Sequence, residues 1–171
     1  MPRFPIPDIA LKTIYDLKPA LLAEMDISLL FMDLDNTIAT YSSKRPSVKL
    51  RNWTDSLKKA GIEPFILSNN RWRRPGIFAN SLSIEHISAA GKPKTEKLLR
   101  VLSAKGIAPE NAAIIGDQIF ADVLCGLRAG ITTISVRPVS LKNPLYFLRY
   151  GIESPFRFMR SRHNNYEKKE R

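Results

Sequence analysis

Two aspartates one residue apart, Asp33 and Asp35, stand directly after the largely apolar run 27–32. A short apolar run bounded by polar residues predicts a buried strand of a parallel sheet, and such sheets bind ligands beyond the carboxyl ends of their strands. Alternate residues of an extended strand point the same way, so both carboxylates would enter one pocket. Two carboxylates held that close need a cation or a shared proton. The pair therefore predicts a metal site, a proton-transfer role or both, with ordinary Asp-Asn turn chemistry as the alternative.

Three further polar groups each follow a predicted strand, which places them at the same edge of the sheet as Asp33. They are Ser68-Asn69-Asn70, Gly91-Lys92-Pro93 and Gly116-Asp117-Gln118, the last followed by Asp122. Together they supply carboxylates, a hydroxyl with an amide, and an ammonium. A phosphoryl-transfer site needs this set: oxygen ligands for Mg²⁺, hydrogen-bond donors to phosphate oxygens and a fixed positive charge.

The elements that must position these groups alternate between strand and helix along the chain. Strands are expected at 28–33, 64–67, 86–87, 112–115 and 132–136, and helices at 47–60, 75–82, 94–105 and 119–129. At the N-terminus, Asp8 is expected to cap a helix that begins at Ile9 and has a break or kink at Pro19. Strand–helix alternation with short connections predicts an α/β fold with a doubly wound parallel sheet.

The ordered set of motifs resembles the haloacid dehalogenase-like (HAD-like) phosphatases. It reads Asp33-x-Asp35-x-Thr37, then Ser68, then Lys92, then Gly116-Asp117-x-x-x-x-Asp122, and the resemblance covers residues 27–136. Within that superfamily, the stretches Asp33–Thr37, Ser68–Asn70, Lys92-Pro93 and Gly116–Gln118 look like the small YqeG-type branch. That branch includes phosphatidylglycerophosphate phosphatases of mitochondrial and plastid type. The resemblance implies a Rossmann-like α/β core.

The resemblance also implies a role for each acidic residue. Asp33 would attack phosphorus and form an aspartyl-phosphate, and Asp35 would protonate the leaving group and then deprotonate the attacking water. The Asp33 and Asp117 carboxylates and the Asp35 backbone carbonyl would hold Mg²⁺. Asp122 would be a further ligand or would support the others, although a surface carboxylate one turn into a helix is the alternative reading of this position.

Phosphate binding would fall, by the same resemblance, to Ser68, Asn69 and Lys92, with Thr37 beside them. Simple turn or helix-cap roles are the alternatives for Thr37 and Ser68. Arg71 and Arg74 lie in the sequence Arg71-Trp72-Arg73-Arg74. A guanidinium group binds phosphate in a bidentate manner, with two N–H groups donating to two oxygens. The two arginines would suit a substrate with a second phosphate, and a solvated basic loop is the alternative.

The spacing of the motifs leaves no room for an inserted cap domain. Thirty residues separate Thr37 from Ser68, and 23 separate Ser68 from Lys92, and each interval is largely used by its own helix and strand. The sequence therefore predicts a capless site. A capless site stays open, which suits a bulky, polymeric or membrane-held phosphate ester.

Basic residues are concentrated at the end of the chain. The formal charge is +11, and residues 137–171 hold nine Lys/Arg against three Asp/Glu. The segment 143–162 mixes aromatic and aliphatic residues with arginines, which is typical of an anchor that lies on an anionic membrane. Packing over the domain with the arginines in solvent is the alternative, and Gly151 and Pro155 argue against one continuous helix. We expect a phosphatase domain over 1–140, including the N-terminal helix, and a basic aromatic extension over 141–171.

Composition narrows the setting in which the chain works. With 171 residues, 44% of them hydrophobic, one globular domain is expected, and the single Cys125 excludes an internal disulfide. The first residues lack a secretory apolar core, so we expect a cytoplasmic protein that contacts the membrane peripherally. The expected substrate is an anionic phospholipid, phosphatidylglycerophosphate. A soluble sugar-phosphate or nucleotide phosphatase is the first rival. A nucleic-acid- or ribosome-binding module with a vestigial site is the second, but such a module has no need of both aspartates.

Overall fold

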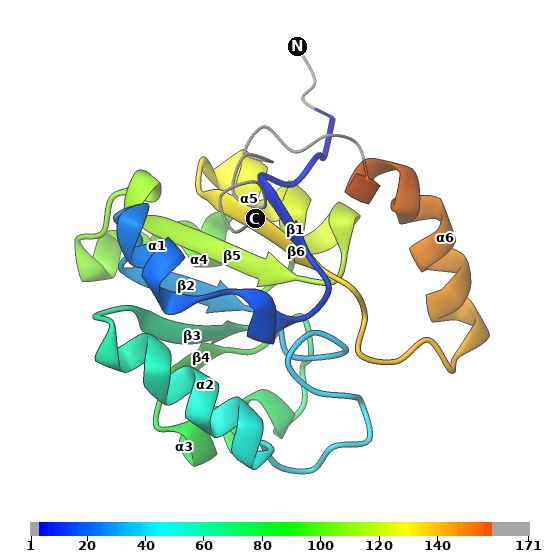
Figure 1. Ribbon diagram of the computed structural model, residues 1–171, viewed down its shortest axis with the longest axis horizontal. Helices are drawn as coiled ribbons and strands as arrows, with labels where there is room; N and C mark the ends of the chain where they lie inside the picture. Colours follow the sequence, from blue (N-terminus) through cyan, green and yellow to red (C-terminus); the bar gives the residue numbers. More distant parts are fainter. Residues whose placement is uncertain (1–3, 159–171) are drawn as a thin grey trace, which may run out of the picture.

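The computed structural model describes residues 4–158, which form a six-stranded parallel sheet with helices on both faces (Figure 1). The strand order is β1-β6-β5-β2-β3-β4. The strands are β1 Ile9–Leu11, β2 Leu29–Met32, β3 Glu63–Leu67, β4 Glu85–Ile87, β5 Ala112–Gly116 and β6 Thr132–Val136. The α-helices are α1 Pro19–Glu24, α2 Val48–Lys59, α3 Arg74–Leu82, α4 Glu96–Lys105, α5 Leu124–Ala129 and α6 Pro144–Phe158. Short 3₁₀ turns at Ile14–Asp16 and Pro109–Asn111 and a π turn at Ile119–Val123 complete the order.

The two faces of the sheet bury alternate residues of each central strand. In β2, Leu30 and Met32 pack with α1, α2 and α3, whereas Leu29 and Phe31 pack with α4 and α5. All four residues of this strand are buried, as expected for a parallel strand covered on both faces. The alternation of side chains along a strand thus accounts for the two hydrophobic layers of the doubly wound fold, which confirms the predicted fold class.

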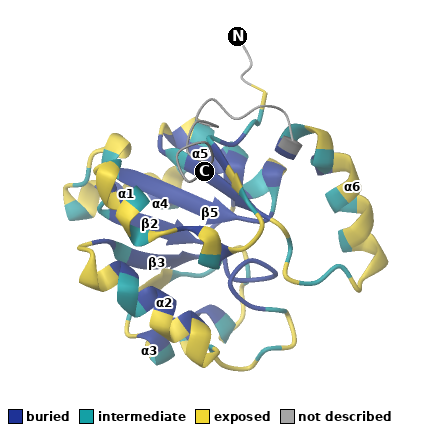
Figure 2. Cartoon of the chain, in the orientation of Figure 1, coloured by how far each residue is buried: buried dark blue, intermediate teal, exposed yellow. Residues whose placement is uncertain are grey.

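The strands end together at one edge, where the polar motifs begin. The Asp33 backbone N–H still donates to the Ile115 carbonyl at 3.0 Å, so the ladder between β2 and β5 continues to the first aspartate. Figure 2 shows that the loop after β2 is buried like the strand before it, and every residue from Asp33 to Ala39 is buried. Only loop segments join β2 to α2 and β3 to α3, so no domain is inserted at either point.

The predicted N-terminal helix from Ile9 is wrong. Ile9–Leu11 is instead an edge strand that pairs with β6, and a helix forms only from Pro19 onward. Asp8 caps no helix because its carboxylate accepts from Thr133, from the backbone N–H at 2.9 Å and the hydroxyl at 2.8 Å. Proline lacks the N–H that an interior helical position must donate, so Pro19 begins the helix rather than kinking it.

The expected interruption at the C-terminal end is also wrong, because α6 is one continuous helix through Gly151 and Pro155. Proline removes a single hydrogen bond there, and buried contacts on either side of it offset the loss: Arg157 donates to the Val136 carbonyl, and Phe120 N–H donates to Glu153 at 3.5 Å. The part of the predicted anchor beyond Phe158 lies outside the described residues. Within residues 4–158, no helix has both the length and the apolar character that a membrane crossing requires.

Gly116, the last residue of β5, offers a test of this packing. A Cβ built on Gly116 would lie 2.2 Å from the Asp122 Cγ, whereas one on Gly151 would meet nothing within 4 Å. We expect Gly116→Ala to lower the free energy of unfolding by ~2 kcal/mol or more, because a buried side chain must move. Gly151→Ala, the matched control in an open part of α6, should be neutral or stabilising by up to ~1 kcal/mol. Urea unfolding of both variants measures this, and equal stabilities would contradict the packing.

Candidate active site

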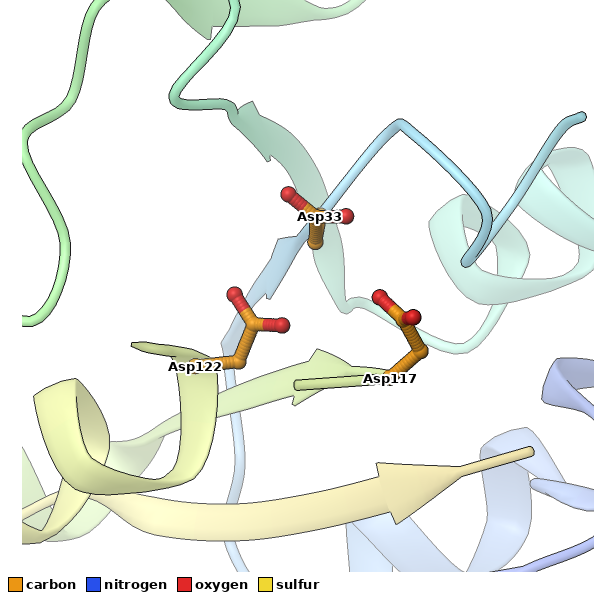
Figure 3. A group of neighbouring side chains, drawn as sticks. All are labelled: Asp33, Asp117 and Asp122. Carbon is orange, nitrogen blue, oxygen red and sulfur yellow. The ribbon is translucent and has the colours of Figure 1, made fainter. Parts of the chain in front are cut away.

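Three buried carboxylates converge at the carboxyl edge of the sheet (Figure 3). Asp33 follows β2, Asp117 follows β5, and Asp122 lies in the π turn. One oxygen from each of these carboxylates lies within 4.8 Å of the other two. Asp33 and Asp117 are 84 positions apart in the sequence, and they meet because β2 and β5 are neighbours in the sheet. Asp122 lies only 5 positions after Asp117. We call these three residues the acidic trio.

The π turn after β5 directs Asp122 into the site. Its carboxylate accepts from Gln118 N–H at 3.1 Å, and it rests against Gly116, where a Cβ would collide with it. A π turn is an uncommon local structure that occurs often at functional sites. The predicted regular helix over 119–129 therefore begins with this irregular turn, because Asp122 must face inward rather than lie on a helix surface.

Lys92 neutralises part of the acidic trio. Its Nζ lies 2.7 Å from Asp33 Oδ1 and 2.6 Å from Asp122 Oδ1, and the residue is buried. Burial acts to lower the pKa of Lys92, but the Asp122 and Asp33 carboxylates outweigh it and raise the pKa above its ordinary value. Asn69 fixes the Lys92 backbone, accepting from Lys92 N–H at 2.8 Å and donating to its carbonyl at 3.0 Å. The ammonium is therefore a fixed positive charge.

Thr37 connects two members of the trio. Its Oγ1 lies 3.0 Å from Asp33 Oδ2 and 3.1 Å from Asp117 Oδ1, and it accepts from Asp117 N–H at 3.0 Å. A hydroxyl has one proton to donate, so it serves one carboxylate at a time. The structure thus places Thr37 between the carboxylates, where it orients them.

Asp35 lies at the rim of the site and is held by two donors. Arg74 forms an ion pair with its Oδ1, and Asn70 Nδ2 donates to its Oδ2 at 2.8 Å. Arg74 also donates to the carbonyls of Thr40 and Ser43, which ties the loop after β2 to the start of α3. The predicted phosphate-binding Arg74 is therefore engaged with Asp35 in this structure.

The remaining predicted residues occupy different surroundings. Ser68 is buried and its Oγ accepts from Asn70 N–H at 3.1 Å, which shapes the turn that presents Asn70 to Asp35. Asn69 contacts the Lys92 backbone, as described above. Arg71 is exposed on the loop, next to Trp72, whose exposure is 81%. The structure thus brings together Asp33, Asp117, Asp122 and Lys92, pairs the Asp35 carboxylate with Arg74 and Asn70 instead, and leaves Arg71 outside this network.

Sequence reasoning missed three residues that contact this network: Asn70, Arg149 and Arg157. Arg149 Nη2 lies 3.3 Å from Asp117 Oδ2, and Arg157 Nη2 donates to the Asp117 carbonyl at 2.5 Å. Both arginines come from α6. Asn70 does carry a local signal, because it belongs to the polar group Ser68-Asn69-Asn70 that follows a strand. The arginines carry no local signal, since only the tertiary fold brings α6 to the end of β5.

Electrostatics at the trio favour an added cation. Burial, together with the nearby Asp33 and Asp122 carboxylates, raises the pKa of Asp117 to about 8. Burial also raises the pKa of Asp122 to about 6, although Lys92 acts in the opposite direction. Hard oxygen ligands grouped this closely are what a small divalent cation prefers, and a cation would stabilise the ionised form of all three. The residues present therefore fit a divalent metal ion.

Comparison with known proteins agrees with this geometry. Residues 89–138 match a family model described as "HAD-hyrolase-like". The protein named "Probable phosphatase YqeG" from Bacillus subtilis (strain 168) is 35% identical over 138 residues, which cover 81% of this chain and 80% of the relative. That identity and coverage establish the family.

Solved structures share the fold. One is 3-deoxy-D-manno-octulosonate 8-phosphate phosphatase from Moraxella catarrhalis in complex with magnesium ion, phosphate ion and KDO, with a TM-score of 0.54 and 24% identity over 74% of this chain and 77% of that one. Another is a hypothetical protein from Xanthomonas campestris, with a TM-score of 0.56 and 18% identity over 83% and 77% of the two chains. Identities this low speak for the fold alone. The family model and the relative from Bacillus subtilis show the family, and the acidic trio with Lys92 agrees with it. The chain therefore belongs to the HAD-like hydrolases, as a phosphatase of the YqeG type.

Proposed function

We propose that this phosphatase is a Mg²⁺-dependent phosphomonoesterase that works through an aspartyl-phosphate on Asp33 and converts phosphatidylglycerophosphate to phosphatidylglycerol. The surroundings of Asp33 carry the first half of the proposal. Lys92 and Thr37 each contact one oxygen of its carboxylate, at 2.7 Å and 3.0 Å, so the side chain is fixed at the carboxyl end of β2. A fixed carboxylate beside a fixed cation is the arrangement that nucleophilic attack on a phosphoryl group requires.

The reaction follows in two displacements. In the first, Asp35 enters as the carboxylic acid, released from its ion pair with Arg74; an Asp33 oxygen attacks phosphorus, the bond from phosphorus to the ester oxygen breaks, and Asp35 gives its proton to the departing alkoxide. In the second, Asp35 takes a proton from water as that water attacks phosphorus, and the bond between Asp33 and phosphorus breaks. Inorganic phosphate leaves, and both carboxyl groups return to their starting states.

The other residues of the site support these steps. Lys92, already charged, offsets negative charge on the phosphoryl oxygens, and Ser68 and Asn69 at the end of β3 are proposed to donate to them. The Asp33 and Asp117 carboxylates and the Asp35 carbonyl would hold Mg²⁺, with Asp122 a ligand or a support. When bound, the metal ion neutralises charge on the phosphoryl group and on the trio. Asn70 and Arg74 keep the Asp35 carboxylate at the rim.

The choice of a lipid substrate rests on the absence of a domain inserted after β2 or β3 and on α6. Leu145, Leu148 and Ile152 recur at helical spacing and are 72%, 61% and 58% exposed, with Phe147 beside them. We call Leu145, Leu148 and Ile152 the apolar row of α6. An exposed apolar row on a strongly basic chain suits peripheral contact with an anionic membrane. The capless edge would admit a headgroup that stays attached to its lipid, and Arg71 and Trp72, both exposed on the loop after β3, would add a basic and an apolar side chain for membrane contact.

The substrate and the nucleophile are tested together by phosphate release. We expect the wild-type protein with Mg²⁺ to hydrolyse phosphatidylglycerophosphate in mixed micelles in preference to sugar phosphates and nucleotides. Asp33→Asn should lower the rate by at least ~10³-fold while circular dichroism stays unchanged, because the amide keeps the shape but is a poor nucleophile. Asp55→Asn on α2 is the matched control and should keep full activity. Preference for a soluble ester would replace the lipid assignment, and an active Asp33→Asn would remove Asp33 from the mechanism.

The metal site predicts a pH-dependent stability. The pKa of Asp117 is about 8 in the folded protein against an ordinary value of 3.8, so the folded protein binds more protons than the unfolded chain between these values. Stability without metal should therefore fall as pH rises from about 5 to about 8. We expect the wild type to lose more thermal stability over this window than Asp117→Asn, which lacks the titrating group, and Mg²⁺ to reduce the loss. Calorimetric scans in EDTA and in Mg²⁺ measure this, and parallel profiles of the two proteins would contradict it.

Membrane contact is tested on the apolar row. A triple variant, Leu145→Gln, Leu148→Gln and Ile152→Gln, should reduce co-sedimentation with anionic vesicles by at least ~10-fold, because three exposed apolar side chains lose their burial in lipid. It should also lose activity on vesicle-held substrate and keep hydrolysis of a small soluble ester. Leu99→Gln on α4, where the leucine is 41% exposed, is the control. Failure of the wild-type protein to co-sediment with anionic vesicles at low salt would rule out the membrane contact.

A further inference from the structure

Helix α6 brings a positive charge to the acidic trio from the solvent side. The Arg149 guanidinium lies 3.3 Å from Asp117 Oδ2, and its side chain is 31% exposed whereas that of Asp117 is fully buried. Lys92 pairs with the other two carboxylates of the trio, those of Asp33 and Asp122. Arg149 therefore supplies the cation for the carboxylate of the trio that Lys92 leaves unpaired.

The two ends of α6 are attached to the domain in different ways. At the C-terminal end, Glu153 and Arg157 are buried, and Arg157 donates to the Asp117 and Val136 carbonyls. Phe156 adds an edge-to-face contact with Phe120, with ring centroids 5.3 Å apart. This half of the helix is fixed by buried polar contacts to the end of the sheet.

The N-terminal half is attached more lightly. Tyr146 stacks on Tyr41 of the loop after β2, with ring centroids 4.9 Å apart and planes 7° apart, and Arg149 lies over the Tyr146 ring. Leu145 and Leu148, on the same half, are largely exposed. Figure 1 shows α6 along the side of the molecule to which the strand arrows point. The half of α6 that carries Arg149 is thus the half with the least buried surface.

A divalent cation and Arg149 would compete for the same carboxylate. A cation held by the trio takes an Asp117 oxygen, and two positive groups beside one carboxylate repel each other. The Arg149 guanidinium ends a long side chain on the lightly attached half of the helix. It is therefore the positive group that would move away from Asp117.

We propose that α6 is a gate for the metal site: Arg149 occupies the cation's place at Asp117 while the helix is docked, and metal binds as Arg149 and the first turns of α6 move away. The inference rests on the metal site of the proposed function, and it adds a control of metal affinity by a helix outside the family's motifs. A membrane bound at Leu145 and Leu148 of the apolar row would contact the same half of the helix.

Mg²⁺ binding, measured by isothermal titration calorimetry without substrate, tests the gate. Arg149→Ala should bind Mg²⁺ about threefold to tenfold more tightly than the wild type, because it removes a partly exposed competing charge. Arg149→Lys should stay close to the wild type. Lys142→Ala removes the same charge from an exposed position just before α6 and is the matched control, with unchanged affinity expected.

A second variant separates a gate from a local charge effect. Tyr41→Ala leaves Arg149, its contact with the Tyr146 ring and the trio in place but removes the stacking that holds the N-terminal half of α6, so it should also tighten Mg²⁺ binding. Hydrogen–deuterium exchange should rise in residues 144–150 of the wild type when Mg²⁺ is added, and stay unchanged at 153–157.

The outcomes separate the two proposals. Equal affinities of the wild type and Arg149→Ala would overturn the gate and leave the metal site standing. Tighter binding by Arg149→Ala with no effect of Tyr41→Ala, and with unchanged exchange at 144–150, would also overturn it, because the helix would then not move. Absence of Mg²⁺ binding in every variant would overturn the gate together with the metal site.

Discussion

The crowding of three buried carboxylates at the end of β2 and β5 is the constraint on which the rest of this site depends. Buried like charges are costly unless each is paired. Lys92 pairs with Asp33 and Asp122, Thr37 bridges Asp33 and Asp117, and Arg149 reaches the remaining oxygen of Asp117. The raised pKa of Asp117 shows that this compensation is incomplete. Because part of the negative charge is not compensated, binding of a cation at the trio would be favourable in free energy.

The backbone around the trio is shaped to keep it crowded. Gly116 lacks a side chain where Asp122 must approach, and the π turn directs Asp122 back over the strand end. Asn69 fixes the Lys92 backbone through two hydrogen bonds. Each of these features removes a degree of freedom from a charged group of the site. A rigid arrangement of charges is more useful to phosphoryl transfer than a strong but mobile one.

The loop after β2 and helix α6 contact the site residues from outside the sheet. Arg74 ties the loop after β2 to α3 and holds Asp35 at the rim, so it is an organising residue within this structure. Helix α6 has two different faces. Its inner side meets the site through Arg149 and Arg157, and its outer side exposes the apolar row. Binding at the apolar row and the contact between Arg149 and Asp117 therefore involve the same helix.

Much of this protein was determined by the sequence alone, because its signals are local. Apolar runs predicted the central strands, the residues after them predicted the acidic site, and short intervals predicted the absence of inserted domains. The edge strand at Ile9–Leu11 was missed because three residues carry too weak a pattern, and its pairing with β6 comes from a segment 125 residues away. The continuity of α6 through Pro155 and the pairing of Arg74 with Asp35 likewise depended on contacts distant in sequence. Arg149 at Asp117 is the clearest case: its residue type and helix are visible in the sequence, but only the packing of α6 against the end of β5 decided which charge it meets.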